Sequence, residues 1–192
     1  MGRRPAAETR AHILDTAARL FDAHGVHAVG LQQIIDEFGC GKNLLYREFP
    51  SKDDLVVAYL QARTREWEQR VESAIRPLDG DPGAQLVAIV RDAADKATVA
   101  GTRGCPLRNA FAEFPDPDHP AHRVAVDHFA AVRARLLEIA EQTGARDPGP
   151  LADRIMLIID GLYANGAILG PNGAAAAAVR FAEDVVNAAT HA

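Results

Sequence analysis

The sequence predicts an all-α fold, in which three short N-terminal helices precede a longer helical region. Apolar side chains recur at the three- and four-residue spacing of one helix face, whereas β-branched runs outside that spacing are few. Alanine-rich stretches, which favour helices, point to the same class. Turns rich in Pro and Gly divide the chain after residue 52, at 77–83, 101–106, 115–120, 144–150 and 170–173.

The composition is that of a soluble globular protein with one or two domains. Of the 192 residues, 48% are hydrophobic and 24% are charged, and the formal net charge is −5. Residues 1–52 carry 7 basic and 6 acidic side chains, a net of +1, whereas the remainder carries 14 and 20, a net of −6. The acidic total therefore does not exclude nucleic-acid binding by the first part, although it argues against nonspecific polyanion binding by the whole surface.

The first predicted helix covers about residues 6–24, with an apolar stripe formed by Ile13, Ala17, Leu20 and Phe21. Gly25 closes this helix, because glycine enters the left-handed conformation without steric cost.

Residues 31–49 hold two short helical segments around a turn. The first segment has an apolar face at helical spacing, made by Leu31, Ile34, Ile35 and Phe38. Gly39 and Gly41 permit the turn, and Leu44 and Leu45 would hold the second segment against the first. Such a pair is either an ordinary helical hairpin or a helix-turn-helix, whose second helix enters the DNA major groove.

A long helix is predicted after the sequence FPSKDDL. Pro50 ends the preceding helix, and Ser51 with Asp54 has the spacing of a capping box. This helix should cover residues 52–76, and its spacing places Leu60, Trp67, Val71 and Ala74 on one side. Further helices are expected over 84–100, 107–114, 119–143, 150–169 and 174–190. Helix 150–169 is apolar nearly all round at 155–159 and should be buried on more than one face.

The first 55 residues resemble the tetracycline-repressor (TetR) family. The matching residues, in order and spacing, are Ile13–Leu14, Ala18, Leu20–Phe21, Gly25, Ile34, Gly39, Leu45–Tyr46, Phe49, Ser51–Lys52 and Leu55. The chain departs from the family at Val29–Gly30, Ile35, Phe38, Gly41 and Glu48, where small, capping or basic residues are usual.

This resemblance implies a helix-turn-helix DNA-binding domain over residues 1–52, whose boundary runs into the helix at 52–76. It implies a helical ligand-binding and dimerisation domain over residues 53–192, with the last two helices at the dimer interface. The expected protein is a cytoplasmic homodimer, most simply a repressor released from a near-palindromic operator by a small, mostly apolar effector. Neither a cofactor nor an enzymatic activity is expected, because GxSxG, P-loop and dinucleotide motifs do not occur.

Candidate DNA-binding residues follow from the second helix of the pair. Lys42, Asn43 and Leu44 would read base edges, since Lys reaches guanine acceptors, Asn bridges adenine and Leu meets the thymine methyl. Arg47 could contact a base or a phosphate. Phosphate contacts are expected from Tyr46 and Lys52, whereas Arg3 and Arg4 could form an N-terminal arm that reaches the minor groove or the backbone.

Candidate effector-binding residues are the aromatic and polar side chains of the second part, where a plain core role is the alternative. They are Trp67, Asn109, Phe111, Phe114, Phe129, Met156 and Tyr163.

Alternative regulators use other chemistry. Cys105 lies between Arg103 and Arg108, whose charges could make its thiol redox-reactive. Potential metal ligands gather at Asp116, Asp118, His119, His122 and His128, although no further ligand set is defined. A helical interaction module without an effector is the third alternative.

A reduced, cytoplasmic protein is expected. Arg3 and Arg4 have no apolar core behind them, unlike a secretory or twin-arginine signal. The uncharged run at 161–179 is interrupted by Pro171 and glycines, and the two cysteines, Cys40 and Cys105, form no disulfide framework.

Overall fold

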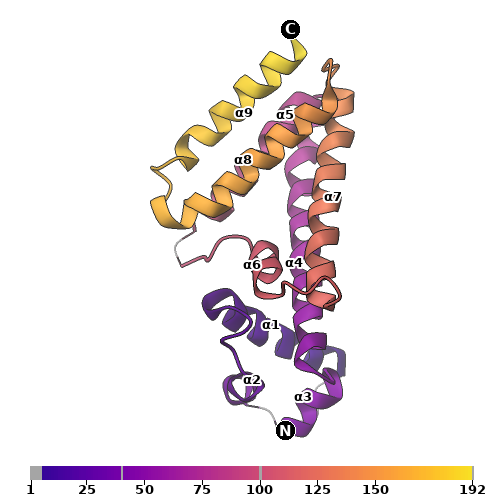
Figure 1. Cartoon of the computed structure of the whole chain (residues 1–192), viewed down its shortest axis with the longest axis vertical. Coiled ribbons are helices and arrows are strands. Elements are labelled where there is room, and N and C mark those ends of the chain that lie inside the picture. Colours follow the sequence, from indigo (N-terminus) through magenta and orange to yellow (C-terminus); the bar gives the residue numbers. More distant parts are fainter. Residues whose placement is uncertain (1–5, 40, 100, 192) are drawn as a thin grey trace. The chain divides into compact units, whose positions relative to one another are not determined.

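The computed structural model describes residues 6–39, 41–99 and 101–191. The regular secondary structure of these residues is helical, with no strand among them (Figure 1). The helices are α1 (Ala6–His24), α2 (Leu31–Phe38), α3 (Lys42–Glu48), α4 (Lys52–Ile75), the 3₁₀ turn η1 (Arg76–Leu78), α5 (Pro82–Ala97), α6 (Pro106–Glu113), α7 (Pro120–Gln142), α8 (Pro148–Leu169) and α9 (Ala175–Thr190). The predicted all-α class is confirmed.

The chain forms two compact units. The first unit combines Met1–Thr64 with Pro106–Ala125, and the second combines Arg65–Cys105 with Val126–Ala192. The units separate within α4, the helix into which the boundary expected after residue 52 already ran. α6 and the start of α7, expected in the second domain, are grouped with the N-terminal helices.

The first unit is built on the predicted apolar stripes of its helices. Ile13, Ile34, Leu45, Phe49 and Leu55 have no exposed surface. They come from α1, α2, the α3 region and α4, so one small core fixes the helix-turn-helix against its neighbours.

Local signals end and begin these helices as predicted. Gly25 and Gly39 have φ values of 87° and 72°, and the Gly39 N–H donates to the Ile35 carbonyl. The Asp54 N–H donates to Ser51 Oγ at 3.0 Å, and the Ser51 N–H donates to Asp54 Oδ2 at 3.0 Å. This reciprocal pair is the predicted capping box, and it fixes where α4 starts.

In the second unit, α5, α8 and α9 pack on one another, and α4 and α7 contribute to the same core (Figure 1). A Cβ atom at Gly166 of α8 would lie 2.6 Å from the Ala97 carbonyl oxygen, so this glycine allows α8 to approach the end of α5. Helix α5 starts two residues earlier than predicted, because Asp81 caps it through the Ala84 N–H and Pro82 occupies the first turn.

Helix α8 packs against both α5 and α9, as expected for a helix buried on more than one face, yet part of its apolar surface stays open. Ile155, Ile158 and Ile159 are buried, but Leu157 is 69% exposed in the single chain. Helix α8 therefore keeps one apolar strip that its own chain does not cover.

Candidate nucleic-acid interface

Helix α3 exposes polar side chains on the face opposite its buried anchor. Lys42 and Asn43 are exposed, Leu44 is half-buried and Leu45 is fully buried. The predicted base-reading side chains thus occupy the first turn of a helix that is held from behind. This is the arrangement that a recognition helix requires.

Tyr46 and Lys42 form a second feature of this face. The Lys42 ammonium lies 5.7 Å from the Tyr46 ring centroid, and Tyr46 is 40% exposed. The ring orients the ammonium through a cation–π contact.

Arg47 has a partner that sequence reasoning did not assign. Its Nη2 lies 2.7 Å from Glu48 Oε1, and the Glu48 side chain is only 10% exposed. The carboxylate that departs from the family pattern therefore neutralises the adjacent guanidinium. Arg47 must share or leave this pair to contact DNA.

Lys52 begins α4, one residue after the capping serine. Partial burial lowers the pKa of its ammonium, whereas the negative charges of Glu113 and Asp53 oppose that shift. Lys52 is thus a half-buried cation at the N-terminus of α4, where the amides of the first helical turn also favour an anion.

Several contacts in the first unit were missed by sequence reasoning, because they join residues far apart in the chain. The Arg10 guanidinium lies 4.2 Å from the Phe49 ring centroid. The His27 N–H donates to Glu113 Oε2 at 2.7 Å, so the end of α6 is bonded to the α1–α2 loop.

Aromatic stacking reinforces the attachment of α6 to the N-terminal helices. The Phe114 ring stacks on His119 with centroids 4.4 Å apart and meets the edge of His27 at 4.8 Å. His119 Nε2 also lies 3.5 Å from Asp53 Oδ2 at the start of α4. Phe114, predicted as an effector contact, is therefore surrounded here by groups of the first unit.

The other predicted effector residues fall into two groups. Phe111 and Asn109 belong to the first unit with Phe114, and Phe111 lies against His122 with centroids 4.8 Å apart. The second unit contains the remainder, Trp67, Phe129, Met156 and Tyr163.

Trp67 and Phe129 meet through His128. The His128 ring lies 5.6 Å from the Trp67 ring and 5.4 Å from the Phe129 ring, with edge-to-face geometry in both cases. His128 is 6% exposed, and burial lowers its pKa to about 4. It is therefore neutral at physiological pH.

Tyr163 of α8 lies in a second polar group, near Arg70, which is one turn along α4 from Trp67. Burial raises the pKa of the Tyr163 phenol to about 12; the nearby charges of Cys105 and Asp92 act in the same direction, while Arg70 opposes them. Arg70 Nε also donates to Asp92 Oδ2 at 3.2 Å. Arg70 and Asp92 were not predicted, and they add a partly buried ion pair to a lining expected to be almost free of charge.

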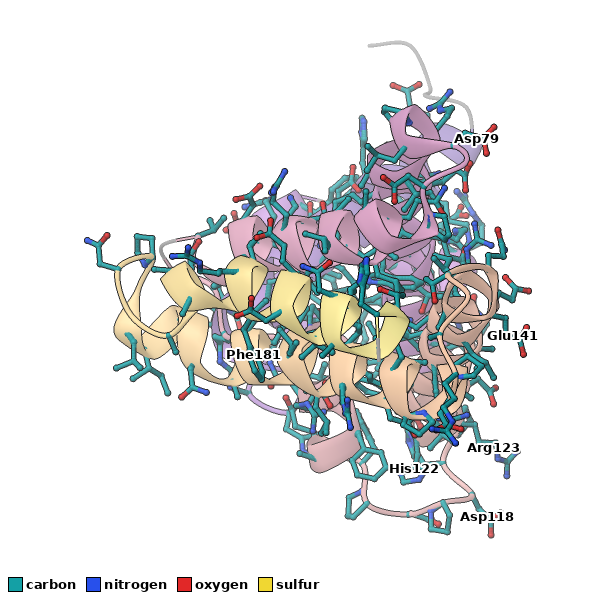
Figure 2. All side chains as sticks on the ribbon, turned by 90° about the horizontal axis from the view of Figure 1, so that it is seen from above. Asp79, Asp118, His122, Arg123, Glu141 and Phe181 are labelled. Atoms are coloured by element: carbon teal, nitrogen blue, oxygen red, sulfur yellow. The ribbon has the colours of Figure 1, made fainter. Side chains whose placement is uncertain are left out.

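The potential metal ligands of the alternative interpretation, Asp116 to His128, are not assembled into one site. Among the residues that the structure describes, no three His, Cys, Asp or Glu side chains meet as metal ligands. Instead Asp118 pairs with Arg123, and His122 Nδ1 is bonded to the Phe114 carbonyl (Figure 2). His128 belongs to the second unit.

The last two helices carry an open apolar groove. It has a volume of about 720 Å³, and its lining includes Leu157 and Phe181, which are 69% and 57% exposed. Figure 2 shows Phe181 on α9. Arg154 of α8 and Asp184 of α9, which are both exposed, also line the groove. Such an exposed apolar strip is typical of a protein–protein contact.

Two further points concern the predictions. Arg3 and Arg4 lie outside the described residues. None of the described helices is long and apolar enough to cross a membrane.

The chain is similar to known regulators over nearly its whole length. Residues 13–59 match the family model described as bacterial regulatory proteins, tetR family. A TetR-family transcriptional regulator from Streptomyces coelicolor, SCO4454, is 33% identical with a TM-score of 0.90, and the match covers 96% of this chain and 97% of that one. A regulator from Streptomyces avermitilis is 30% identical with a TM-score of 0.80, over 94% and 97% of the two chains.

A more distant relative extends the similarity beyond this group. The HTH-type transcriptional regulator YjdC of Escherichia coli is 23% identical over 182 residues, which are 92% of this chain and 93% of that protein. Together with the helix-turn-helix geometry, these similarities show that the chain belongs to the TetR family of transcriptional regulators and is not an enzyme.

Proposed function

We propose that this regulator is a homodimeric, ligand-responsive repressor that leaves a near-palindromic operator when it binds a small molecule. The observation that carries the proposal is the face of α3, where exposed Lys42 and Asn43 stand on the buried anchor Leu45. A positioned helix with free donors at its first turn is suited to major-groove reading.

In the proposed complex, base reading and phosphate binding are divided between α3 and α4. Asn43 reads adenine, Lys42 reads guanine acceptors and Leu44 meets a thymine methyl group. Tyr46, Arg47 and Lys52 hold the backbone, which sets the register without carrying sequence information.

The proposed dimer uses the α8–α9 groove. A two-fold axis places the same strip of both chains together, so Leu157 and Phe181 of one protomer would cover those of its partner. Arg154 and Asp184 of the lining supply opposite charges that can pair across the axis. Specificity supports this assembly, since a single helix-turn-helix contacts too few base pairs to select one site.

The proposed effector site lies in the second unit, around the turn of α4 that carries Trp67 and Arg70. The aromatic rings of Trp67 and Phe129 suit an apolar body, and the Arg70–Tyr163 pair suits one acceptor group on the ligand. Helix α4 is continuous from Lys52 to Ile75, so a displacement at Trp67 is transmitted to the proposed phosphate contact. A ligand that favours the released state by about 1–3 kcal/mol lowers operator affinity about 5- to 150-fold.

Affinity selection from random double-stranded DNA tests the proposal. The full chain is expected to enrich a two-fold symmetric site, whose half-sites are spaced by about 10 base pairs or a multiple. Asn43→Ala should relax the preference at one position of each half-site. Failure of the wild-type chain to enrich any site over nonspecific DNA would refute the proposed function.

A further inference from the structure

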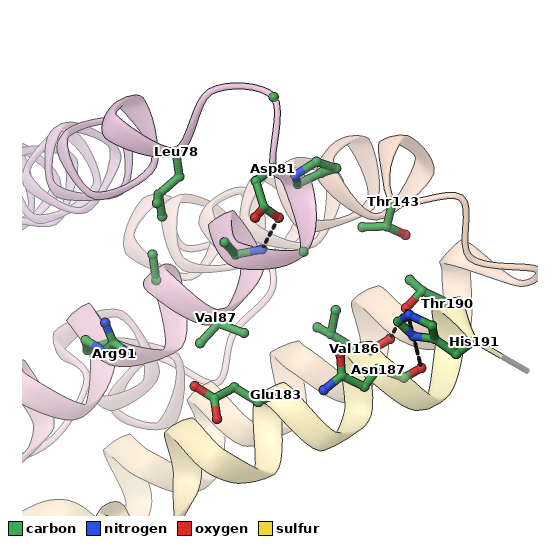
Figure 3. Close-up of a pocket in the computed structure, with 15 residues that line it drawn as sticks. Leu78, Asp81, Val87, Arg91, Thr143, Glu183, Val186, Asn187, Thr190 and His191 are labelled. Carbon is green, nitrogen blue, oxygen red and sulfur yellow. Dashed lines mark hydrogen bonds between the residues drawn. The ribbon is translucent and has the colours of Figure 1, made fainter.

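A separate cavity lies in the second unit, where the start of α5 faces the end of α9 (Figure 3). Its volume is about 670 Å³, within the range of small-molecule sites. Thr143, beyond the end of α7, closes one side. The proposed effector residues Trp67 and Tyr163 do not line it, and neither do Leu157 and Phe181 of the α8–α9 groove.

Two buried valines form the apolar floor of this cavity. Val87 of α5 and Val186 of α9 are 9% and 6% exposed. A Cβ atom at Gly83 would lie 3.2 Å from Val186 Cγ1, so this glycine lets the first turn of α5 approach the Val186 side chain of α9 closely. The floor can therefore support a short hydrocarbon body.

Charged side chains of opposite sign stand above this floor on the two facing helices. Arg91 extends from α5 and Glu183 from α9, and neither forms an ion pair or hydrogen bond with any residue that the structure describes (Figure 3). Asp81 also lines the cavity, and one of its carboxylate oxygens accepts the Ala84 N–H. The site thus offers the guanidinium of Arg91 to an anion, and the carboxylates of Glu183 and Asp81 to a cation.

These charges select among ligand classes. A simple anion at Arg91 would be repelled by the carboxylates of Glu183 and Asp81, and a simple cation would be repelled by Arg91. A molecule that carries both charges can pair with Arg91 and with Glu183 at once. The guanidinium binds a carboxylate through paired hydrogen bonds, and the carboxylate binds an ammonium group.

We propose that this cavity is a second small-molecule site, which binds an amphipathic zwitterion. The ligand's carboxylate pairs with Arg91, its ammonium pairs with Glu183, and its apolar body rests on Val87 and Val186. The site adjoins the proposed dimer interface through α9, yet it uses none of the residues in the α8–α9 groove.

The test uses ε-aminocaproate as the probe and the full isotope-labelled chain, with binding followed by NMR at the methyl groups of Val87 and Val186. Saturable chemical-shift changes are expected at the methyl groups of both valines. Caproate and hexylamine, which each lack one charge, should bind at least about tenfold more weakly. Equal binding by either of them, or no saturable shift with the zwitterion, would overturn the proposal.

Charge variants locate the two contacts. Arg91→Gln and Glu183→Gln should each weaken ε-aminocaproate binding about tenfold, because both groups are exposed and the fold does not depend on them. The exchange variant Arg91→Glu/Glu183→Arg should recover binding, since a probe with a charge at each end can enter reversed. Unchanged affinity in the single variants, or no recovery in the exchange variant, contradicts the assignment.

Discussion

The pairing of Arg47 with Glu48 determines how much positive charge α3 can offer to a phosphate. Glu48→Gln removes a carboxylate that holds the Arg47 guanidinium at 2.7 Å. Operator binding should strengthen about two- to fivefold, in keeping with the modest energy of an ion pair that has one exposed partner. Fluorescence anisotropy with labelled operator measures the change.

The double variant Arg47→Gln/Glu48→Gln is the control, and it should lose this gain. Weaker binding by Glu48→Gln alone would instead mean that the carboxylate orients Arg47 for base reading.

Lys52 is proposed to contact phosphate rather than a base. Lys52→Ala should therefore weaken binding evenly across DNA sequences and reduce the salt slope of log K by about one unit. The matched control is Lys96→Ala, an exposed lysine of α5 in the other unit, which should leave the slope unchanged. A changed sequence preference with an unchanged slope would assign Lys52 to base reading.

At this scale, sequence reasoning was strongest for local features. Gly39 and the Ser51–Asp54 pair were predicted correctly, because each depends on residues within one helical turn. The contacts of Arg10 with Phe49 and of Glu113 with His27 could not be predicted, since they require knowledge of which distant segments meet.

Helix α7 buries an ionisable group, His128, so the free energy of unfolding of the protein should depend on pH. The pKa of His128 is about 4 in the folded chain and about 6.5 when unfolded, so between these values the unfolded chain binds a proton that the folded chain does not. Stability should consequently fall as the pH drops through this window, by up to about 1.4 kcal/mol per pH unit.

Urea unfolding at several pH values measures this dependence. His128→Gln removes the titrating group, so its stability should decline less than that of the wild type between about pH 6.5 and about pH 4. Parallel curves for the two proteins would show that His128 is not held neutral by burial.

At the scale of elements, helical periodicity predicted the helices to within a few residues. Apolar stripes and Pro or Gly boundaries depend only on residues that are close together in the sequence. The grouping of residues 106–125 with the N-terminal helices could not be predicted in the same way. It depends on Phe114 stacking with His27 and His119, and these residues are no more distinctive in sequence than ordinary core and loop residues.

Trp67 is the chain's one tryptophan, so its fluorescence reports on the proposed effector site alone. A compound that releases operator DNA should quench or shift this emission, because it displaces the contact between Trp67 and His128. Trp67→Ala should blunt the release and leave ligand-free operator binding largely intact, while Trp67→Phe should retain part of the response. Normal release from a stably folded Trp67→Ala protein would place the effector site elsewhere.

The dimer was predicted from family resemblance, and the periodicity of α8 and α9 indicated only that they are buried against something. The exposed side chains of Leu157 and Phe181 add a physical reason for the assembly. Phe181→Glu introduces a charge into this strip, which should destabilise the dimer by several kcal/mol if both copies are buried at the axis. Val99→Glu, at a 54% exposed position outside the groove, is the matched control and should remain dimeric.

Analytical ultracentrifugation of the full chain with its selected operator tests the central claim most directly. Two chains are expected on each duplex for the wild type and for Val99→Glu. Phe181→Glu should sediment as a folded monomer and lose operator affinity by at least about 100-fold, because each head then binds a half-site alone. One wild-type chain per duplex, or full operator affinity in a monomeric Phe181→Glu protein, would contradict it.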